Sequence, residues 1–458
     1  MTTKPSVVLR RDRLVRFEAG HPWIFAGEIE KMEGEAQPGG LVSVRDHRGR
    51  LLGTGFWNPH SQIAVRVVSY GDLDVLDEEW FRRRFAWCLE HRRRFSGNDA
   101  SGRLVNAEAD FLPGLIVDRF ADVLVVQVLT LGMEAARDAW LPALVETFRP
   151  RGVYERSDVG VRALEGLPER AGLLWGECPE RVLIEENGLK MEVDIASGQK
   201  TGHFFDQREN RAAIAPLMTG WGARSGIVLQ EKDGRLAPFN RKGKEVTFPW
   251  WDGATVLDAF AHTGGFTLHA CKFGAKSVTC LDVSRQAIEL ARRNVELNGF
   301  EDRVEFVVDN AFEYLRRHVR GREERLRRAD AGKPGVKIDT SKPLPPEGRT
   351  WDVIILDPPA FAKTKRAVPD AIRGYKDINL HALKLINEGG YLVTASCSYH
   401  VRPELFLDII REAARDAGKV LRRIEWRGAS RDHPVLLAAE EGDYLKFGIF
   451  EVRSKREF

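Results

Sequence analysis

The feature that most constrains this chain is a short apolar run that ends in a carboxylate and then turns on glycine. Residues 255–266 read TVLDAFAHTGGF, with two apolar side chains directly before Asp258. This pattern predicts a buried strand whose last side chain faces a ligand, and Gly264 lets the backbone approach that ligand closely. A second run, SVTCLD, ends at Asp282 about one helix length later. The two runs predict a β-α-β unit that binds its ligand at the strand carboxyl ends.

The alternation of strands and helices continues toward the C-terminus. Three further apolar runs end in side chains that can bind or react: Asp309 with Asn310, Asp357, and Cys397. Because the carboxyl ends of parallel strands share one edge of a sheet, these side chains should lie close together. A helix is predicted from 284 to 298, with Ser284 as its N-cap, and a last, reversed strand from 444 to 452. The region 196–458 is therefore predicted to be an α/β, Rossmann-like domain.

Charge separates the two nucleotide-type ligands that use such a layout. A dinucleotide would bring its pyrophosphate toward Asp258, which would repel it, and the turn lacks a spaced G-x-G-x-x-G. S-adenosylmethionine instead carries a cationic amine and a sulfonium that Asp258 attracts, while Asp282 can accept hydrogen bonds from both ribose hydroxyls. We therefore predict S-adenosylmethionine as the cofactor. Taken alone, the motif also fits an ordinary strand-turn-helix of any α/β domain.

The rest of the chain differs from this domain in pattern. A length of 458 residues exceeds what one core usually holds. Short apolar runs with period-2 alternation between residues 7 and 70 predict a small β-barrel, and mixed strands and helices follow it. The predicted domains are the barrel at 1–72, a central α+β module at 73–195 and the α/β domain at 196–458.

Basic and aromatic residues gather near the barrel. Arg10 and Arg11 lie close in sequence to Trp23, and a helix predicted from 77 to 95 carries six more arginines. Such residues can bind RNA, although aromatic residues in small barrels often belong to the core and charged helix faces are often only solvated. Because the formal net charge is only +3, local patches must hold any nucleic acid.

Two stretches interrupt the α/β pattern. Residues 220–252 are predicted to form an inserted hairpin, and residues 316–337 are predicted to form a mobile, basic surface loop. RNA contact is the alternative for the second stretch.

Cysteine spacing and hydropathy indicate the cellular compartment in which we expect the protein. Five cysteines are scattered without a C-x-x-C pair, which argues against zinc and against a disulfide framework. The first twenty residues contain no apolar signal region, and no apolar run of membrane-spanning length occurs. We expect a soluble, cytoplasmic protein that binds no metal and contacts no membrane.

The segment that follows the strand at 351–356 carries a motif of base-modifying enzymes. Its sequence is Asp357-Pro358-Pro359-Ala360-Phe361. The prolines hold the turn rigid, the acid can hydrogen-bond a base edge, and the ring can stack on the base. As an isolated peptide it could be a simple turn, but its place in the strand order favours a site where substrate meets cofactor.

Cys397 decides which reaction the sequence favours. Carbon 5 of cytosine is a poor nucleophile until a thiolate adds to carbon 6. Cys397 stands at a strand exit beside the row of acids, whereas Cys271 and Cys280 fall inside a helix and a strand and fit small buried residues. Methylation of a base nitrogen needs no cysteine there, so the sequence favours carbon 5 of cytosine.

With these motifs the chain resembles the bacterial large-subunit ribosomal RNA cytosine-5 methyltransferases that carry an N-terminal PUA domain. The resemblance covers nearly the whole length through GHPWIF, RLVNAEADFLPGLIVDRF, YERSDVGVR, KTGHFFDQREN, LDAFAHTGGF, LDPPAF and SCS. It implies a PUA barrel, a central module that helps to form the RNA cleft and a class I methyltransferase domain, with large-subunit ribosomal RNA as partner.

The resemblance also implies roles for single residues. It assigns Cys397 as nucleophile, Asp357 as the group that orients the cytosine, and three residues that close over the cofactor: Phe204, Asp206 and Arg208. Whether Asp309 or Asn310 reads the adenine stays open. Other RNA cytosine methyltransferases have a second cysteine where this chain has Ala360, so the base that removes the carbon-5 proton also stays open.

Two alternatives from other classes remain at this point. One is a methyltransferase that acts on a guanine or adenine nitrogen, and the other is a non-catalytic RNA-binding scaffold. The intact row of acids argues against the scaffold. The target nucleotide, the form of the RNA substrate and the oligomeric state, a homodimer among the options, are not determined by the sequence.

Overall fold

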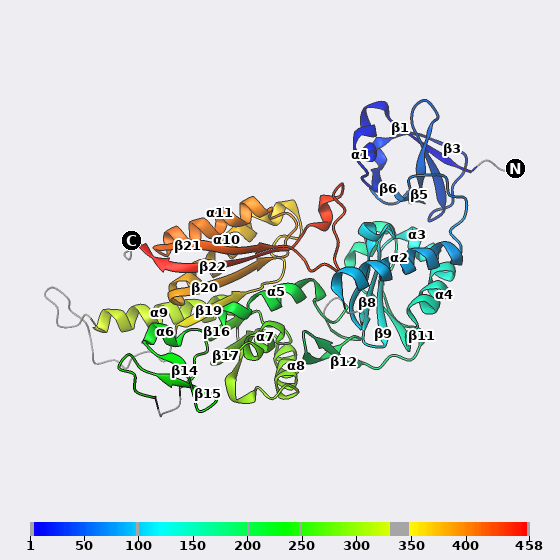
Figure 1. The fold of residues 1–458 in the computed structure, drawn as a ribbon. Coiled ribbons are helices and arrows are strands. Elements are labelled where there is room, and N and C mark those ends of the chain that lie inside the picture. The colour runs from blue at the N-terminus through cyan, green and yellow to red at the C-terminus, as the bar shows by residue number, and fades with distance from the viewer. Residues whose placement is uncertain (1–3, 98–99, 199–200, 247–249, 330–347, 456–458) are drawn as a thin grey trace. The chain divides into compact units, whose positions relative to one another are not determined.

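A computed structural model of the chain describes residues 4–97, 100–198, 201–246, 250–329 and 348–455. The chain folds into two compact units. The first comprises Met1–Arg208 together with Ser430–Asp443, and the second comprises Glu209–Ala429 and Tyr444–Phe458. The barrel and the central module thus belong to one compact unit, and a segment near the C-terminus returns to it (Figure 1).

The N-terminal barrel is a curved sheet of six strands with a short helix, α1 (Leu14–Glu18). The strands, in the order β2-β6-β5-β4-β1-β3, are β2 (Trp23–Phe25), β6 (Ile63–Ser69), β5 (Leu51–Trp57), β4 (Leu41–Arg45), β1 (Ser6–Leu9) and β3 (Ile29–Glu33). Val42 and Val44, which lie on one face of β4, are both fully buried, and Ser43 between them is buried as well. The predicted barrel is confirmed.

The central module is a five-stranded sheet covered by helices. Its strands, in the order β11-β10-β9-β8-β7, are β11 (Arg170–Gly176), β10 (Gly152–Ser157), β9 (Val123–Val128), β8 (Leu115–Phe120) and β7 (Ser101–Asn106). The helices are α2 (Glu78–Ser96), α3 (Leu131–Ala135) and α4 (Arg137–Phe148), and a hairpin of β12 (Arg181–Glu186) and β13 (Leu189–Asp194) follows. Asp77 caps α2 by accepting a hydrogen bond from the Trp80 amide at 2.8 Å.

Aromatic residues of the barrel are used to join it to the central module. The Trp23 indole donates to Glu108 Oε1 at 2.9 Å, and Arg66 pairs with Glu108 and Glu165 at 3.0 and 2.9 Å. Phe56 packs so closely on Gly132 that a Cβ there would lie 2.0 Å from the ring. These aromatic rings therefore stabilise the unit, which is the structural alternative to RNA binding.

The second unit contains a seven-stranded sheet with one strand reversed. In the order β18-β17-β16-β19-β20-β22-β21 the strands are β18 (Val304–Val308), β17 (Ser277–Asp282), β16 (Thr255–Ala259), β19 (Trp351–Leu356), β20 (Ile386–Ser396), β22 (Lys446–Ser454) and β21 (Lys419–Arg427). The first five are mutually parallel, and β22 runs antiparallel to both neighbours. The predicted Rossmann-like sheet and its reversed strand are confirmed, and β21 is an addition that the sequence did not predict.

Helices cover both faces of this sheet. One face packs against α9 (Ala311–Ala329), α10 (Val368–Leu385) and α11 (Pro403–Asp416) through residues such as Leu257, and the other packs against α7 (Gly265–Lys272) through residues such as Val256. The remaining helices are α5 (Arg208–Ala213), α6 (Gly222–Ser225) and α8 (Arg285–Glu296), which Ser284 caps at the Ala287 amide. Within the described part of the chain, no helix has the length and apolar character needed to cross a membrane.

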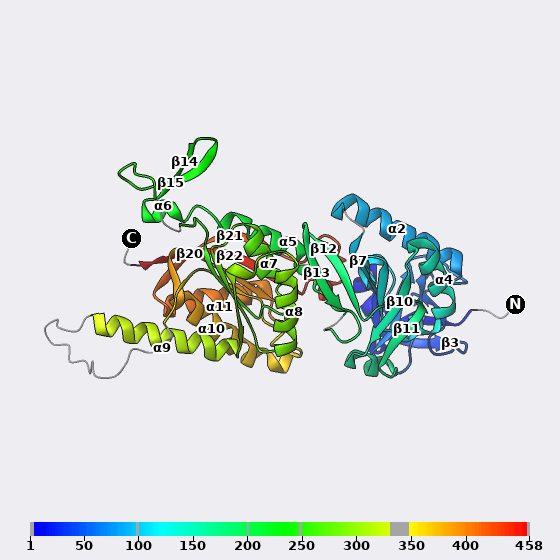
Figure 2. The same ribbon diagram turned by 90° about the horizontal axis from the view of Figure 1, so that it is seen from below.

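The two interrupting stretches behave differently. The predicted hairpin is present as β14 (Val228–Lys232) and β15 (Arg235–Phe239), which stand away from the large sheet (Figure 2). The predicted loop was wrong where it can be tested, because residues 316–329 continue α9. Leu315 and Val319 are buried one turn apart, and arginine and glutamate are good helix formers. Residues 330–347 lie outside the described part of the chain.

Candidate active site

The centre of the candidate site is Asp258 near the end of β16, a side chain with no exposed surface. Thr267 on α7 donates its hydroxyl to Asp258 Oδ2 at 2.7 Å, and Oδ1 has no hydrogen-bond partner among the described residues. Burial raises the pKa of Asp258 to about 7, and the nearby carboxylates of Asp357 and Asp282 add to the rise. A buried carboxylate with a spare oxygen is suited to receive a cation from a ligand.

The turn after Asp258 is held in an unusual backbone conformation. Gly264, the N-cap residue directly before α7, has φ of +84°, and a Cβ there would lie 3.2 Å from the Ala291 Cβ. Phe260 and His262 also have positive φ, +65° and +51°, although both carry side chains. Such strain persists only where the surrounding structure enforces it and is frequent at ligand sites. The sequence indicated the glycine but gave no signal for the other two residues.

Asp282, at the end of β17, is oriented by this turn. Its Oδ2 accepts a hydrogen bond from the His262 amide at 2.9 Å, and its Oδ1 accepts one from the Ser284 amide at 2.8 Å. Each carboxylate oxygen can accept a second hydrogen bond. The structure thus brings Asp282 to the turn that follows Asp258, as the strand order predicts.

Asp309 and Asn310, which follow β18, both have structural partners. The Asn310 Oδ1 accepts from the amides of Phe312 and Glu313 at 3.0 and 3.3 Å and so caps α9. Asp309 forms an ion pair with Arg317 of the same helix. A role in adenine recognition for either residue stays a prediction.

Cys397 and the Asp-Pro-Pro-Ala-Phe segment meet at neighbouring strand ends. Cys397 directly follows β20, is half-buried, and its thiol donates to the Pro358 carbonyl oxygen at 3.8 Å. Asp357 directly follows β19 and is half-buried, whereas Pro359 is exposed. By contrast, Cys271 and Cys280 are buried, and burial raises the pKa of the Cys271 thiol to about 12. Of these three cysteines, Cys397 is the one that is half-buried at this edge, and its role as a nucleophile stays a prediction.

The ring of Phe361 has a structural contact that the sequence did not reveal. It lies 4.5 Å from the Tyr375 ring and 5.7 Å from the Phe312 ring, measured between centroids. Phe361 therefore anchors the segment on α10 and α9, and a stacking role toward a base stays a prediction.

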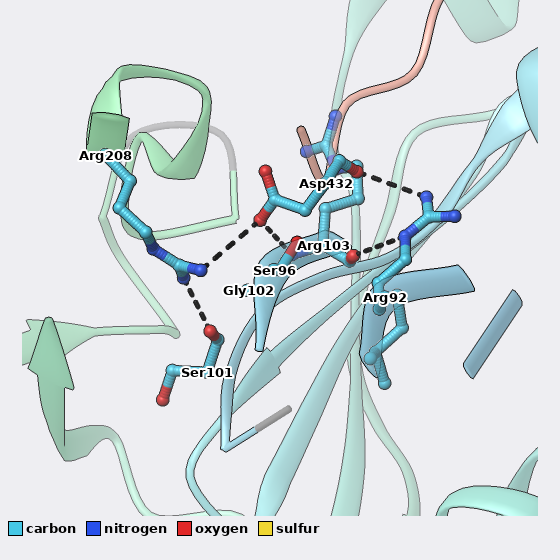
Figure 3. Close-up of a pocket in the computed structure, with 8 residues that line it drawn as sticks. Arg92, Ser96, Ser101, Gly102, Arg103, Arg208 and Asp432 are labelled. Atoms are coloured by element: carbon cyan, nitrogen blue, oxygen red, sulfur yellow. Dashed lines mark hydrogen bonds and ion pairs between the residues drawn. The ribbon is translucent and has the colours of Figure 1, made fainter. Parts of the chain in front are cut away.

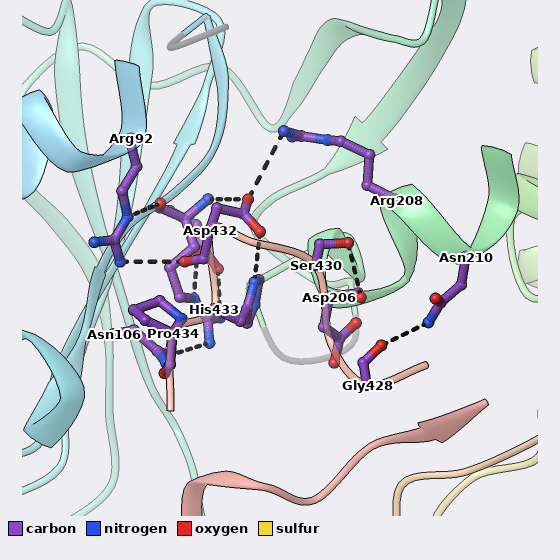
Figure 4. A network of polar contacts seen from close by, with 12 residues as sticks. Arg92, Asn106, Asp206, Arg208, Asn210, Gly428, Ser430, Asp432, His433 and Pro434 are labelled. Carbon is purple, nitrogen blue, oxygen red and sulfur yellow. Dashed lines mark hydrogen bonds and ion pairs between the residues drawn. The ribbon is translucent and has the colours of Figure 1, made fainter. Parts of the chain in front are cut away.

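Three predicted cofactor residues lie in the first compact unit. The Asp206 carbonyl oxygen accepts from the amide and hydroxyl of Ser430 at 2.8 and 2.9 Å (Figure 4). Arg208 donates to the Ser101 carbonyl oxygen at 2.5 Å. Phe204 precedes them and is half-buried. Their action on the cofactor stays a prediction.

The same unit holds a small pocket that the sequence did not indicate (Figure 3). It is lined by Arg92, Ser96, Ser101, Gly102, Arg103, Leu104, Arg208 and Asp432. Arg92 binds both carboxylate oxygens of Asp110, at 2.8 and 2.6 Å, and the Asp432 carbonyl oxygen at 3.1 Å. The charges of Arg92 and Asp110 are thus paired, so this arginine of the predicted RNA-binding helix stabilises the fold.

Arg10 and Arg11 are exposed on the barrel, as RNA binding would require. Arg10 Nε donates to the Ile29 carbonyl oxygen at 3.4 Å, which leaves most of the guanidinium facing outward. RNA contact by both residues stays a prediction.

Comparison with known proteins shows the family to which this chain belongs. The PUA-like domain family matches residues 7–70, and the family described as conserved hypothetical protein 95 matches residues 222–325. The ribosomal RNA large subunit methyltransferase I of Pseudoalteromonas translucida (strain TAC 125) is 38% identical over 445 residues, which are 96% of this chain and 98% of the relative. The protein of the same name from Salmonella arizonae is 36% identical over 446 residues, 96% of each chain. This chain belongs to the ribosomal RNA large subunit methyltransferase I family.

Solved structures agree on the fold of this large-subunit methyltransferase family member. A protein from Streptococcus mutans, provisionally described as a SAM-dependent methyltransferase, aligns with a TM-score of 0.71 at 19% identity and covers 97% of this chain and 99% of its own. Another, provisionally described as a methyltransferase and complexed with SAH, aligns at 0.73 and 20% identity with the same coverage. The predicted fold class is therefore confirmed.

Proposed function

We propose that this protein is an S-adenosylmethionine-dependent methyltransferase that forms 5-methylcytosine in large-subunit ribosomal RNA. The observation that carries the proposal is the half-buried thiol of Cys397, which contacts the Pro358 carbonyl oxygen. Both residues follow strands of the parallel sheet whose neighbours β16 and β17 carry Asp258 and Asp282 at their carboxyl ends. The family relationship supports methylation of large-subunit ribosomal RNA, and the cysteine supports carbon 5 of cytosine.

The residues present fit the proposed cofactor. Asp258 offers a buried carboxylate oxygen that has no hydrogen-bond partner among the described residues, and a cationic amine would supply the missing charge. Asp282 is held by two backbone amides in an orientation in which it can still accept from ribose hydroxyls. When bound, S-adenosylmethionine supplies an electrophilic methyl group. We propose Gly264, Asp309, Asn310, Asp357, Phe204, Asp206 and Arg208 as the further cofactor-binding residues.

Cys397 would act on the cytosine ring. Its thiolate adds to carbon 6, and the electron pair of the ring double bond moves to carbon 5, which then takes the methyl group. Loss of the carbon-5 proton restores the double bond and expels the thiolate. Asp357 would hold the base after it leaves its stack, with Pro358, Pro359 and Phe361 shaping the place where it stands.

The test is a comparison of Cys397→Ala with Cys271→Ala. We expect Cys397→Ala to retain affinity for cofactor and RNA and to lose methyl transfer, because the lost bond exists only along the reaction path. The buried Cys271→Ala control should remain active. Mass spectrometry of methylated ribosomal RNA fragments measures the product and its base.

A trapping experiment checks the covalent step. RNA with 5-fluorocytosine at the target should capture the wild type as a covalent adduct, because fluorine cannot leave as a proton does. Asp357→Ala should slow this capture. Robust methyl transfer by Cys397→Ala, or an adduct at Cys271 or Cys280, would instead favour methylation of a base nitrogen.

A test of RNA binding by the barrel requires substitutions that are milder than deletion of the barrel. Removing residues 1–72 would remove Phe56, which packs on Gly132, and Arg66, which pairs with Glu108 and Glu165. The deletion would therefore also destabilise the central module. Replacing Arg10 and Arg11 by alanine should instead raise the RNA dissociation constant, reduce its salt dependence by about two charges and leave cofactor affinity unchanged.

A further inference from the structure

A buried lysine donates a hydrogen bond to the backbone of the turn that contains Cys397. Lys446 is the first residue of β22 and pairs with Ser396, the last residue of β20. Only 2% of Lys446 is exposed. Its Nζ donates to the Ser398 carbonyl oxygen and to the Tyr444 carbonyl oxygen, each at 2.7 Å. The lysine thus binds the backbone of the residue that directly follows the nucleophile.

Hydrogen bonds between hydroxyl groups also stabilise this turn. Tyr375 of α10 is fully buried, and its Oη lies 3.0 Å from the Oγ atoms of both Ser396 and Ser398. Ser398 Oγ also accepts from the Ala362 amide at 3.1 Å, which ties the turn to the segment that begins at Asp357. Both residues that flank Cys397 are therefore fixed.

A lysine is a costly choice for a position that needs only packing. Removing an ammonium group from water carries a free-energy penalty, which an apolar side chain of similar length would avoid. The hydroxyls already tether the turn, so the distinctive property of Lys446 is its charge. A positive charge bound to the carbonyl oxygen of Ser398, the residue that follows Cys397, would favour the thiolate over the thiol of Cys397.

We propose that Lys446 is a positioning residue for Cys397, which fixes the turn after β20 and favours the thiolate form of the nucleophile. The proposal rests on the proposed function only in taking Cys397 as the reacting group. Other ionisable groups on the elements around the turn are Tyr375 on α10, Asp357 after β19, and Tyr399, His400 and Arg402 in the turn itself. These groups are unchanged in the variants below.

The test is the pH dependence of Cys397 alkylation in the intact protein. Iodoacetamide reacts with thiolates, and peptide mass spectrometry separates Cys397 from the half-buried Cys178. In Lys446→Met we expect the alkylation midpoint to rise by about one pH unit or more. Lys446→Arg should retain the wild-type midpoint. Lys419→Met, which removes a half-buried lysine that binds Ser454 on the neighbouring strand, is the matched control and should change nothing.

Methyl transfer supplies the second measurement. At pH 7 the single-turnover rate of Lys446→Met should fall by about tenfold, recover partly at pH 9, and leave cofactor affinity within about twofold, because a tenfold smaller thiolate fraction accompanies each unit of pKa. If Lys446→Met does not fold, Lys446→Gln keeps two donors without the charge and should show the same shift.

An alkylation profile unchanged in a folded Lys446→Met or Lys446→Gln protein would overturn the proposal. This outcome is independent of the RNA target, because alkylation needs neither RNA nor cofactor. An active Cys397→Ala enzyme would instead overturn the proposed function, so the two failures can be told apart.

Discussion

Two buried aspartates, Asp118 in the first compact unit and Asp258 in the second, differ in how their charge is paired. In the first unit Asp118 has no exposed surface, and Arg103 binds both of its carboxylate oxygens at 2.8 and 2.9 Å, with Thr201 adding a bond at 2.7 Å. In the second unit Asp258 is equally buried, its Oδ2 accepts from the Thr267 hydroxyl at 2.7 Å, and no ion pair of Asp258 is found among the described residues. The Asp118 carboxylate is thus paired with an arginine, whereas within the described part of the chain the Asp258 carboxylate is paired with no cation.

The pKa directions follow this difference. Burial by itself raises the pKa of Asp118, but the Arg103 guanidinium outweighs burial and holds the pKa below its usual value. Asp432 is similar, since burial is outweighed by His433 and Arg208. Burial also raises the pKa of Asp258, and the neighbouring acids reinforce the rise. A buried carboxylate left without a cation destabilises the fold, and a ligand that carries a positive charge would remove this cost.

The largest expected effect comes from breaking the internal pair. Arg103→Ala leaves Asp118 buried without its partner, so the free energy of unfolding of the first unit should fall by about 3–5 kcal/mol. Urea denaturation measures this loss. Arg151→Ala, which removes an exposed pair with Asp122 at 3.4 Å, should cost less than about 1 kcal/mol. Equal losses in the two variants would contradict the comparison.

The second effect concerns affinity instead of stability. Asp258→Asn should weaken S-adenosylmethionine binding about tenfold to a hundredfold, since it removes a charge-assisted contact of about 1.5–3 kcal/mol. Its stability should be maintained or raised, because the variant no longer buries a charge. Calorimetric titration measures the affinity. Asp352→Asn is the control: Asp352 binds Thr255 at the opposite end of β16 and should not affect the cofactor.

The third effect is a pH dependence with a defined sign. Because the pKa of Asp258 is raised to about 7, the unliganded carboxyl is protonated below that pH and attracts a cation less. Affinity for S-adenosylmethionine should therefore fall up to tenfold per pH unit below 7, and Asp258→Asn should lose this slope. The folded state binds the extra proton, so this group makes the fold more stable as pH falls from 7 toward 4. Identical slopes for wild type and variant would assign the dependence elsewhere.

The smallest expected effect distinguishes two roles of Asn310, the cap of α9 and a contact with the cofactor. Asn310→Ala should lower the free energy of unfolding by about 1 kcal/mol, because the amides of Phe312 and Glu313 lose their acceptor, and Asn310→Asp should preserve it. Thermal unfolding and cofactor titration are measured together. If Asn310→Ala weakens cofactor binding and Asp309→Ala does not, Asn310 is the residue that reads the adenine.

The sequence by itself determined the parts that depend on local pattern and chain order. Apolar runs that end in Asp258, Asp282, Asp357 and Cys397 specify parallel strands, and parallel strands bring their carboxyl ends to one edge wherever they occur. The contact between Cys397 and Pro358 follows from this rule. The barrel, the inserted hairpin and the reversed strand were predictable for the same reason, since period and punctuation are local.

Only the tertiary structure decided which charged groups are paired. Arg92 was one arginine among six on a predicted helix, yet it is 1% exposed and bonds to Asp432, 340 residues away. No local pattern reveals a partner at that distance. The continuation of α9 was missed because its charged residues suggested a solvated loop, whereas Leu315 and Val319 pack on the sheet. The same holds for the Asp258 oxygen without a described partner and for the hydrogen bond from Lys446 to Ser398. Both sites are buried by strands and helices that are distant in sequence, and electrostatic interactions are stronger where water is excluded.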